Sequence, residues 1–264
     1  MTRLTLFAKG NVDIHDSLHS CRLGGELAWN GINEALRVSH PGCTARVKHE
    51  TWTRSDALLR AEGKVPEVIG RRQLALGSYP ASSQFSRAIF ETKTDAIVLS
   101  IQPDVTNHPL KHKREGFFLD ATDSQQWSKE DKEWLKSDFD TLGLLDVAES
   151  MANFASIVEK IQKQSEAAIL IYNMSPIIPG ETIHCYQGTD ESYSIRIRKF
   201  NLGLIELSKA TGVSIIDVES LVARKGADAL KLDTVHLTPP GYQLIAEEVV
   251  RVLEDLGVLT GEKS

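Results

Sequence analysis

The chain has 264 residues, of which 41% are hydrophobic and 25% charged, and its formal net charge is −6. Such a composition is typical of a globular protein, and the length suits one α/β domain with a full hydrophobic core. The negative charge and the absence of a long basic tract argue against nucleic acid and anionic membranes as partners, and the cluster Lys111–Arg114 indicates a solvated loop.

The N-terminus and the cysteines bear on the cellular compartment. The chain opens on the apolar run Leu4–Ala8 without a charged leader, and no stretch reaches 18 apolar residues, so neither a secretory signal nor a membrane span is expected. Cys21, Cys43 and Cys185 are widely spaced and form no C-x-x-C pair. We therefore predict a cytoplasmic protein with reduced thiols and without a cofactor, and a homo-oligomer is left open.

Strands and helices alternate in the predictions for the first 101 residues. The expected elements are a strand at 3–8, a loop at 12–25, a helix at 26–37, strands at 44–50 and 74–76, a helix at 83–91 and a strand at 96–101. The run Ala96–Ile101 is continuously apolar, which is typical of a central parallel strand.

The same alternation continues after a polar stretch at 102–138, which we interpret as a lid-like insertion with a helix from Lys129. Its aromatic residues, Phe117, Phe118, Trp127 and Trp134, indicate an apolar cover. The later elements are a helix at 145–163, a strand at 167–172, a Pro/Gly-rich loop at 173–190, a helix at 194–211, a strand at 213–217 and a C-terminal helix after Thr238. Gly212 is a typical residue for ending a helix.

This order predicts an α/β fold: one domain over residues 1–264, built as a three-layer α/β/α sandwich around a central parallel sheet. Ligands of such sheets bind at the carboxyl ends of the strands. The turns after Lys9, Leu76, Ile101 and Tyr172 all fall at that edge, so we expect the site there.

A carboxylate and a histidine stand three residues apart before the last helix, as Asp233 and His236. Thr238 is a suitable N-cap, and proline is tolerated in the first turn because its missing N–H has no partner within the helix. The apolar spacing of the helix predicts one buried face, which would hold the turn in place. A histidine oriented by a carboxylate is the base half of a nucleophilic triad.

Asp233-x-x-His236, followed by Gly241-Tyr242 and an amphipathic helix, resembles the last signature block of the SGNH (GDSL-type) hydrolases. The resemblance implies a flavodoxin-like fold, an N-terminal serine and Ser-His-Asp hydrolysis of an ester or acyl group of a small molecule. Leu76-Gly77 resembles the second block, whose glycine N–H helps to form an oxyanion hole. In the third block Asp104 replaces an asparagine; because an ionised aspartate is a poor donor, Asn107 is the alternative amide.

Two alignments of the first block place the nucleophile differently. In one, Gly10-Asn11-Val12 directly follows the first strand, and valine replaces the serine. In the other, His15-Asp16-Ser17-Leu18 keeps the Asp-Ser-Leu sequence after a longer loop, and we prefer this alignment. The predicted catalytic residues are therefore Ser17, Asp233 and His236, and the predicted oxyanion or substrate-binding residues are Asn11, His15, Gly77, Asp104 and Asn107.

Two rival interpretations remain. Asp13-x-His15-Asp16 resembles the opening of metallophosphoesterases, and the N/O ligand set for a divalent metal would be Asp13, His15, Asp104, His108, Asp233 and His236. The later elements of that family are absent from the sequence. Alternatively, because the first and third SGNH blocks are altered, the fold serves acyl transfer without hydrolysis, or binding of a small molecule.

Overall fold

The computed structural model describes residues 2–179 and 191–259, so Cys185 and part of the loop predicted at 173–190 lie outside the described residues. Five parallel strands form the central sheet in the order β10-β9-β5-β1-β4. Their bounds are β1 Thr2–Lys9, β4 Cys43–Glu50, β5 Ala96–Ser100, β9 Ala168–Tyr172 and β10 Ser214–Ile216. Each occurs where the sequence predicts a strand, whereas the strand predicted at 74–76 does not form.

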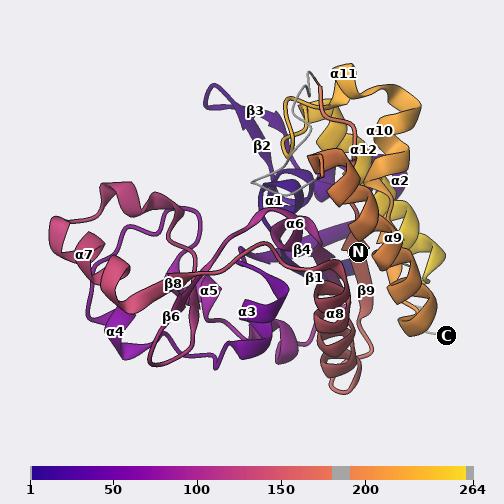
Figure 1. Cartoon of the computed structure of the whole chain (residues 1–264). Coiled ribbons are helices and arrows are strands. Elements are labelled where there is room, and N and C mark those ends of the chain that lie inside the picture. Colours follow the sequence, from indigo (N-terminus) through magenta and orange to yellow (C-terminus); the bar gives the residue numbers. More distant parts are fainter. Residues whose placement is uncertain (1, 180–190, 260–264) are drawn as a thin grey trace.

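Helices cover both faces of this sheet (Figure 1). Alternate residues of β1 point to opposite faces: Leu4 and Leu6 pack in one hydrophobic cluster, and Phe7 packs in the other. The first face is covered by α1 (Val12–Leu18), α2 (Ile32–Ser39), α10 (Val218–Lys225) and α12 (Pro239–Asp255), and the second by α3 (Ser55–Arg60), α8 (Val147–Gln162) and α9 (Tyr193–Thr211). The predicted three-layer α/β/α fold is confirmed.

The C-terminal helices follow the sequence prediction closely. Helix α9 ends at Gly212, whose φ of 76° is the left-handed conformation that glycine adopts readily. Helix α12 buries Ile245, Val249 and Leu253 against the sheet. Thr238 stands at its N-cap position, but its hydroxyl donates to the carbonyl of Ala229 instead of capping the helix.

The segment from residue 12 to residue 31 departs from the prediction. The expected loop contains α1 and then a hairpin of β2 (Cys21–Leu23) and β3 (Glu26–Trp29), so the helix expected from residue 26 begins only at Ile32. Gly24 and Gly25 both have positive φ, as a two-residue hairpin turn requires. Gly31 also has positive φ, and a Cβ there would collide with the carbonyl oxygens of Leu18 and His19.

A lobe stands beside the sheet, on the left in Figure 1. It contains α4 (Glu67–Gly70), α5 (Ala81–Gln84), α7 (Lys129–Asp138) and the antiparallel strands β6 (Leu110–His112), β7 (Phe118–Leu119) and β8 (Phe139–Thr141). Ile69, Phe85, Trp127 and Phe139 form its core, with Trp134 packed against them. The predicted insertion is therefore only part of this lobe, which also uses residues before β5.

The remaining short helices are η1 (Ala88–Phe90), α6 (Gln102–Thr106), η2 (Thr122–Gln126) and α11 (Ala227–Leu230). Within residues 2–179 and 191–259, every helix is too short or too polar to cross a lipid bilayer.

Candidate functional site

A pocket of about 680 Å³ lies at the carboxyl ends of β1, β4 and β5. Its lining includes Asn11 and Val12 from the start of α1, His49 from β4, Gln102 from α6 and His236 from the loop before α12. Another hollow, of about 500 Å³, lies at the amino ends of the strands. Because open α/β sheets bind ligands at the carboxyl ends, the first pocket is the candidate site.

The structure brings Asp233 and His236 together, as their spacing predicts. His236 Nδ1 lies 3.0 Å from Asp233 Oδ1 and 2.8 Å from Oδ2. Oδ1 also accepts hydrogen bonds from the backbone N–H groups of Val235 and His236. Partial burial raises the pKa of Asp233, but these hydrogen bonds outweigh it and hold the pKa below its usual value. An ionised Asp233 therefore fixes the imidazole with Nδ1 protonated and leaves Nε2 as the basic nitrogen.

The turn that carries this pair is anchored on both sides. The backbone N–H of Leu237 donates to the Tyr242 hydroxyl at 3.1 Å, and the N–H of Leu232 donates to the carbonyl of His236 at 3.0 Å. Tyr242 is buried in α12, and burial raises the pKa of its hydroxyl. His236 is thus held by a packed helix although its own side chain is 47% exposed.

Ser17 lies in a different environment. It is fully buried inside α1 and does not line the pocket. Its hydroxyl lies 2.7 Å from the carbonyl oxygen of Asp13 and 3.1 Å from the Tyr172 hydroxyl. Because Ser17 donates to the backbone, Tyr172 is left to donate to Ser17 Oγ. The long loop that the Ser17 alignment requires does not exist, since α1 begins at Val12.

Val12 occupies the position that the other alignment gives to the nucleophile. It directly follows the turn after β1 and lines the pocket together with His236. Beside it, Asn11 is buried and its side-chain N–H donates to Gln102 Oε1 at 3.1 Å. The position after the first strand is therefore apolar in this chain.

Tyr79 also lines the pocket, although no sequence motif marks it. Burial, together with the charge of Asp120, raises the pKa of its hydroxyl to about 12, although contacts with the amides of Asn107 and Asn11 lower it in part. The phenol is therefore neutral and able to donate a hydrogen bond at physiological pH. The Asn11 side chain lies near the Tyr79 hydroxyl. Its Oδ1 atom is buried and has no hydrogen-bond partner in good geometry. The only sequence feature that could have indicated Tyr79 is its position two residues after Gly77.

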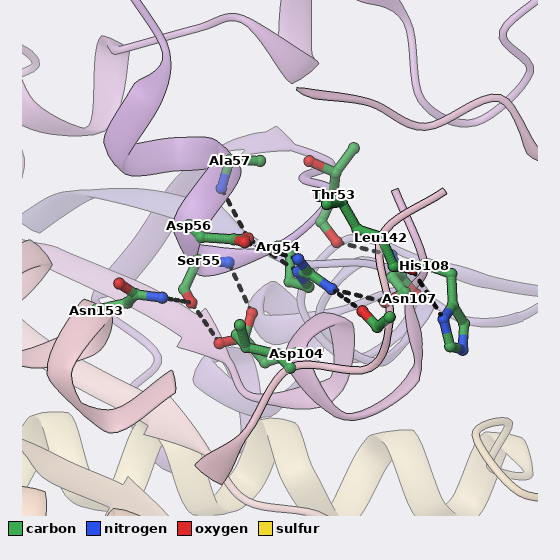
Figure 2. A network of polar contacts seen from close by, with 12 residues as sticks. Thr53, Arg54, Ser55, Asp56, Ala57, Asp104, Asn107, His108, Leu142 and Asn153 are labelled. Atoms are coloured by element: carbon green, nitrogen blue, oxygen red, sulfur yellow. Dashed lines mark hydrogen bonds and ion pairs between the residues drawn. The ribbon is translucent and has the colours of Figure 1, made fainter. Parts of the chain in front are cut away.

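Asp104 and Asn107 belong to a second polar network, drawn in Figure 2, and do not line the pocket. Asp104 accepts hydrogen bonds from Ser55 N–H, Ser55 Oγ and Ser150 Oγ. Burial raises its pKa to about 6 despite these bonds. The amide of Asn107 donates to the carbonyl of Thr53 at 2.9 Å.

The same network ties the lobe to the sheet. Arg54 pairs with both oxygens of Asp56, at 2.9 and 2.7 Å, and donates to the carbonyl of Gly143 at 2.8 Å. Gly77 lies at the edge of the lobe and lines another, smaller hollow. Its φ is 51°, and a Cβ there would meet the carboxylate of Asp123, so a glycine is required for the turn itself.

A cluster of histidines completes the pocket wall. His49 Nε2 lies 2.9 Å from the carbonyl of Gly10, and burial lowers the pKa of His49 to about 4, so its ring is neutral and donates. His15 Nδ1 lies 2.7 Å from Asp16 Oδ1, and both side chains line the pocket. Behind them, Lys9 is fully buried and pairs with Glu50 at 3.0 Å.

The predicted metal-ligand set is dispersed. Asp13 accepts a hydrogen bond from Ser100 Oγ, and burial raises its pKa. Asp104 lies in the network of Figure 2, where His108 Nδ1 is 3.4 Å from the carbonyl of Leu142. Over residues 2–179 and 191–259, no three His, Cys, Asp or Glu side chains are arranged to hold a metal ion.

No protein-family model matches this sequence, and no curated protein does. Among solved structures, LAE5, an α/β hydrolase enzyme from the metagenome of Lake Arreo in Spain, is 12% identical; the match covers 100% of this chain and 99% of that one, with a TM-score of 0.51. The acetyl xylan esterase AlAXEase is also 12% identical, with 95% and 99% covered and a TM-score of 0.51.

A putative SGNH hydrolase from Slackia heliotrinireducens is 13% identical, with 96% and 98% of the two chains covered and a TM-score of 0.49. The two matches with a TM-score of 0.51 show that this chain shares the α/β fold of those two proteins.

Proposed function

We propose that this protein hydrolyses an ester of a small, neutral, polar molecule, with His236 as the general base and Asp233 as the group that orients it. The observation that carries the proposal is that both Asp233 oxygens lie within hydrogen-bond distance of His236 Nδ1 beside the pocket. This leaves His236 Nε2 to take a proton. One solved structure with this fold is an acetyl xylan esterase, which supports an acetyl ester as the first substrate to test.

The nucleophile in this proposal is water. The Ser-His-Asp triad predicted from sequence needs a hydroxyl that reaches the pocket, and Ser17 is buried while Val12 lines the cavity. His236 would remove a proton from water as the water oxygen attacks the acyl carbon. The carbonyl electron pair then moves to oxygen, where the neutral Tyr79 hydroxyl can donate a hydrogen bond.

The pocket lining supports a neutral polar substrate. Thr51, Ser78 and Ser83 bring hydroxyl groups, and Asn11 and Gln102 bring amides. Neither lysine nor arginine occurs among the described residues that line it, so a phosphate or carboxylate group would lack a permanently charged cation to pair with. An acetylated polyol or sugar fits this set of hydrogen-bonding groups better than an anionic ester does.

The test is hydrolysis of glycerol triacetate and 4-nitrophenyl acetate by the purified protein. We expect His236→Gln to lower kcat/KM for both esters by about 10²–10⁴-fold, the usual contribution of a general base. Asp233→Asn should also lower kcat/KM for both esters, because it leaves the imidazole without its anionic partner. His40→Gln, at a histidine outside the pocket, is the matched control. Wild-type protein that hydrolyses neither ester, or full activity in His236→Gln, would overturn the proposal.

A second candidate is binding or transfer without hydrolysis, and the valine at position 12 favours it. In that case glycerol triacetate binds in a calorimetric titration, is not hydrolysed, and His236→Gln changes its affinity. Labelling by a serine-directed fluorophosphonate separates both candidates from the triad mechanism. An adduct on Ser17 would support the triad, whereas the buried hydroxyl predicts none.

A further inference from the structure

We propose that His15 is a second proton-transfer residue of this pocket, which gives the departing alcohol its proton while His236 takes one from the attacking water. The inference rests on the proposed function and names a residue that the mechanism above does not use. It starts from a repetition: two histidines from opposite ends of the chain line one cavity, and each is paired with a carboxylate.

In the His15 pair, as in the His236 pair, a carboxylate oxygen lies within hydrogen-bond distance of Nδ1. His15 Nδ1 lies 2.7 Å from Asp16 Oδ1, and His236 Nδ1 lies 2.8 Å from Asp233 Oδ2. The side chain of His15 is 46% exposed, so substrate can approach it. With Nδ1 donating to Asp16, Nε2 is the nitrogen available for proton transfer.

The neighbours of His15 permit it to carry a positive charge. Its ring stacks on that of His19, with centroids 5.6 Å apart, and meets that of His49 edge-on at 5.3 Å. Burial lowers the pKa of His49 to about 4, and burial and the charge of His15 lower that of His19. His49 is therefore neutral when His15 is protonated, a charge on His19 is disfavoured, and Asp16 is the carboxylate that pairs with His15.

A second histidine allows the two proton transfers to be divided between two groups. In a serine triad, one histidine takes the serine proton and passes it to the leaving group in a separate step. Here water attacks directly, so His236 has just become protonated when the bond between the acyl carbon and the alcohol oxygen breaks. The electron pair of that bond goes to the alcohol oxygen, which takes the proton from His15 Nε2. His236 then releases its proton to solvent and His15 regains one, so the cycle is balanced.

Leaving-group dependence tests this role. An alkoxide needs a proton to depart, whereas 4-nitrophenolate leaves without one, so loss of a general acid harms alkyl esters selectively. We expect His15→Gln to lower kcat/KM for ethyl acetate by about 10²–10⁴-fold, and for 4-nitrophenyl acetate by at least tenfold less. His236→Gln should lower both rates alike. His40→Gln, at a histidine that does not line the pocket, is the matched control.

Each outcome decides one question. Equal losses for both esters in His15→Gln would make His15 a structural residue, and unchanged activity on both would remove it from the mechanism; either result overturns the inference and leaves the role of His236 intact. A wild-type protein that cleaves only the aryl ester also overturns it. If neither wild-type reaction occurs, the proposed function itself fails. Thermal unfolding of each variant shows whether the fold is retained.

Discussion

The residues that the sequence predicts for one site lie in two regions of the structure, the pocket and the protein interior. His236, Asn11 and His15 line the pocket, where His236 is half exposed. Ser17 and Asp104 are instead fully buried in hydrogen-bond networks that satisfy every side-chain oxygen they offer. The same residue types thus do different work: a polar group at the cavity can meet a substrate, whereas a buried one holds structural elements together.

This division predicts two kinds of mutational effect. Substitutions at the pocket should change turnover and leave stability nearly unchanged, and substitutions in the interior should do the reverse. A pocket substitution that mainly changes stability, or an interior substitution that mainly changes turnover, would show that the residue has been assigned to the wrong region.

Tyr79→Phe should lower turnover strongly, although no more than His236→Gln does, because it removes a neutral donor from the pocket wall. Loss of one oxyanion donor lowers the rate by about 10²–10³-fold. We expect a fall in kcat with little change in KM for 4-nitrophenyl acetate, since the hydrogen bond strengthens as charge develops on oxygen. An unchanged kcat would move the oxyanion donor to the amide of Asn11 or Gln102.

Asp104→Asn should change how the free energy of unfolding depends on pH. The folded-state pKa of Asp104 is about 6 and its ordinary value is 3.8, so between these values the folded protein holds a proton that the unfolded chain has lost. Its favourable contribution is therefore present below pH 3.8 and lost as the pH rises through 6. Two pKa units correspond to roughly 3 kcal/mol.

The difference in unfolding free energy between Asp104→Asn and wild type should therefore shift in favour of the variant as the pH rises from about 4 to 7. Urea denaturation at a series of pH values measures this difference. Comparing the two proteins cancels the opposite contributions of Glu50 and Asp233, whose pKa values are lowered in the fold. A difference that does not vary with pH would mean that Asp104 titrates normally.

How much of the fold and of the site could be predicted from sequence depends on how far apart in sequence the contacting residues lie. Asp233 and His236 are three residues apart, so their pairing is local, and the spacing was sufficient to predict it. Strands β5 and β9 were predictable because each is a short apolar run between polar turns, whereas β4 is largely polar and offers a weaker signal. The lobe was not, since its core joins Ile69 and Phe85 to Trp127 and Phe139 across the whole of β5.

The N-terminal nucleophile could not be settled from sequence for the same reason. Whether Asp-Ser-Leu faces a pocket depends on where α1 begins, and that is decided by the turn after Lys9, not by the three residues themselves. Because the helix starts at once, Ser17 falls on the turn that faces Tyr172 in the interior. Tyr79 was missed because no motif marks it.

Ser17→Ala tests the division most directly, although its effect is the smallest. The change leaves the buried Tyr172 hydroxyl without its acceptor, which should lower the free energy of unfolding by about 1–3 kcal/mol. Turnover of both acetate esters should stay close to that of wild type, because Ser17 does not line the pocket. Tyr172→Phe is the matched control: it removes the other half of the same hydrogen bond. In the double variant no buried hydroxyl is orphaned, so the two stability losses should not add. A collapse of activity in Ser17→Ala with the fold intact would place this hydroxyl in the reaction and return the mechanism to a serine triad.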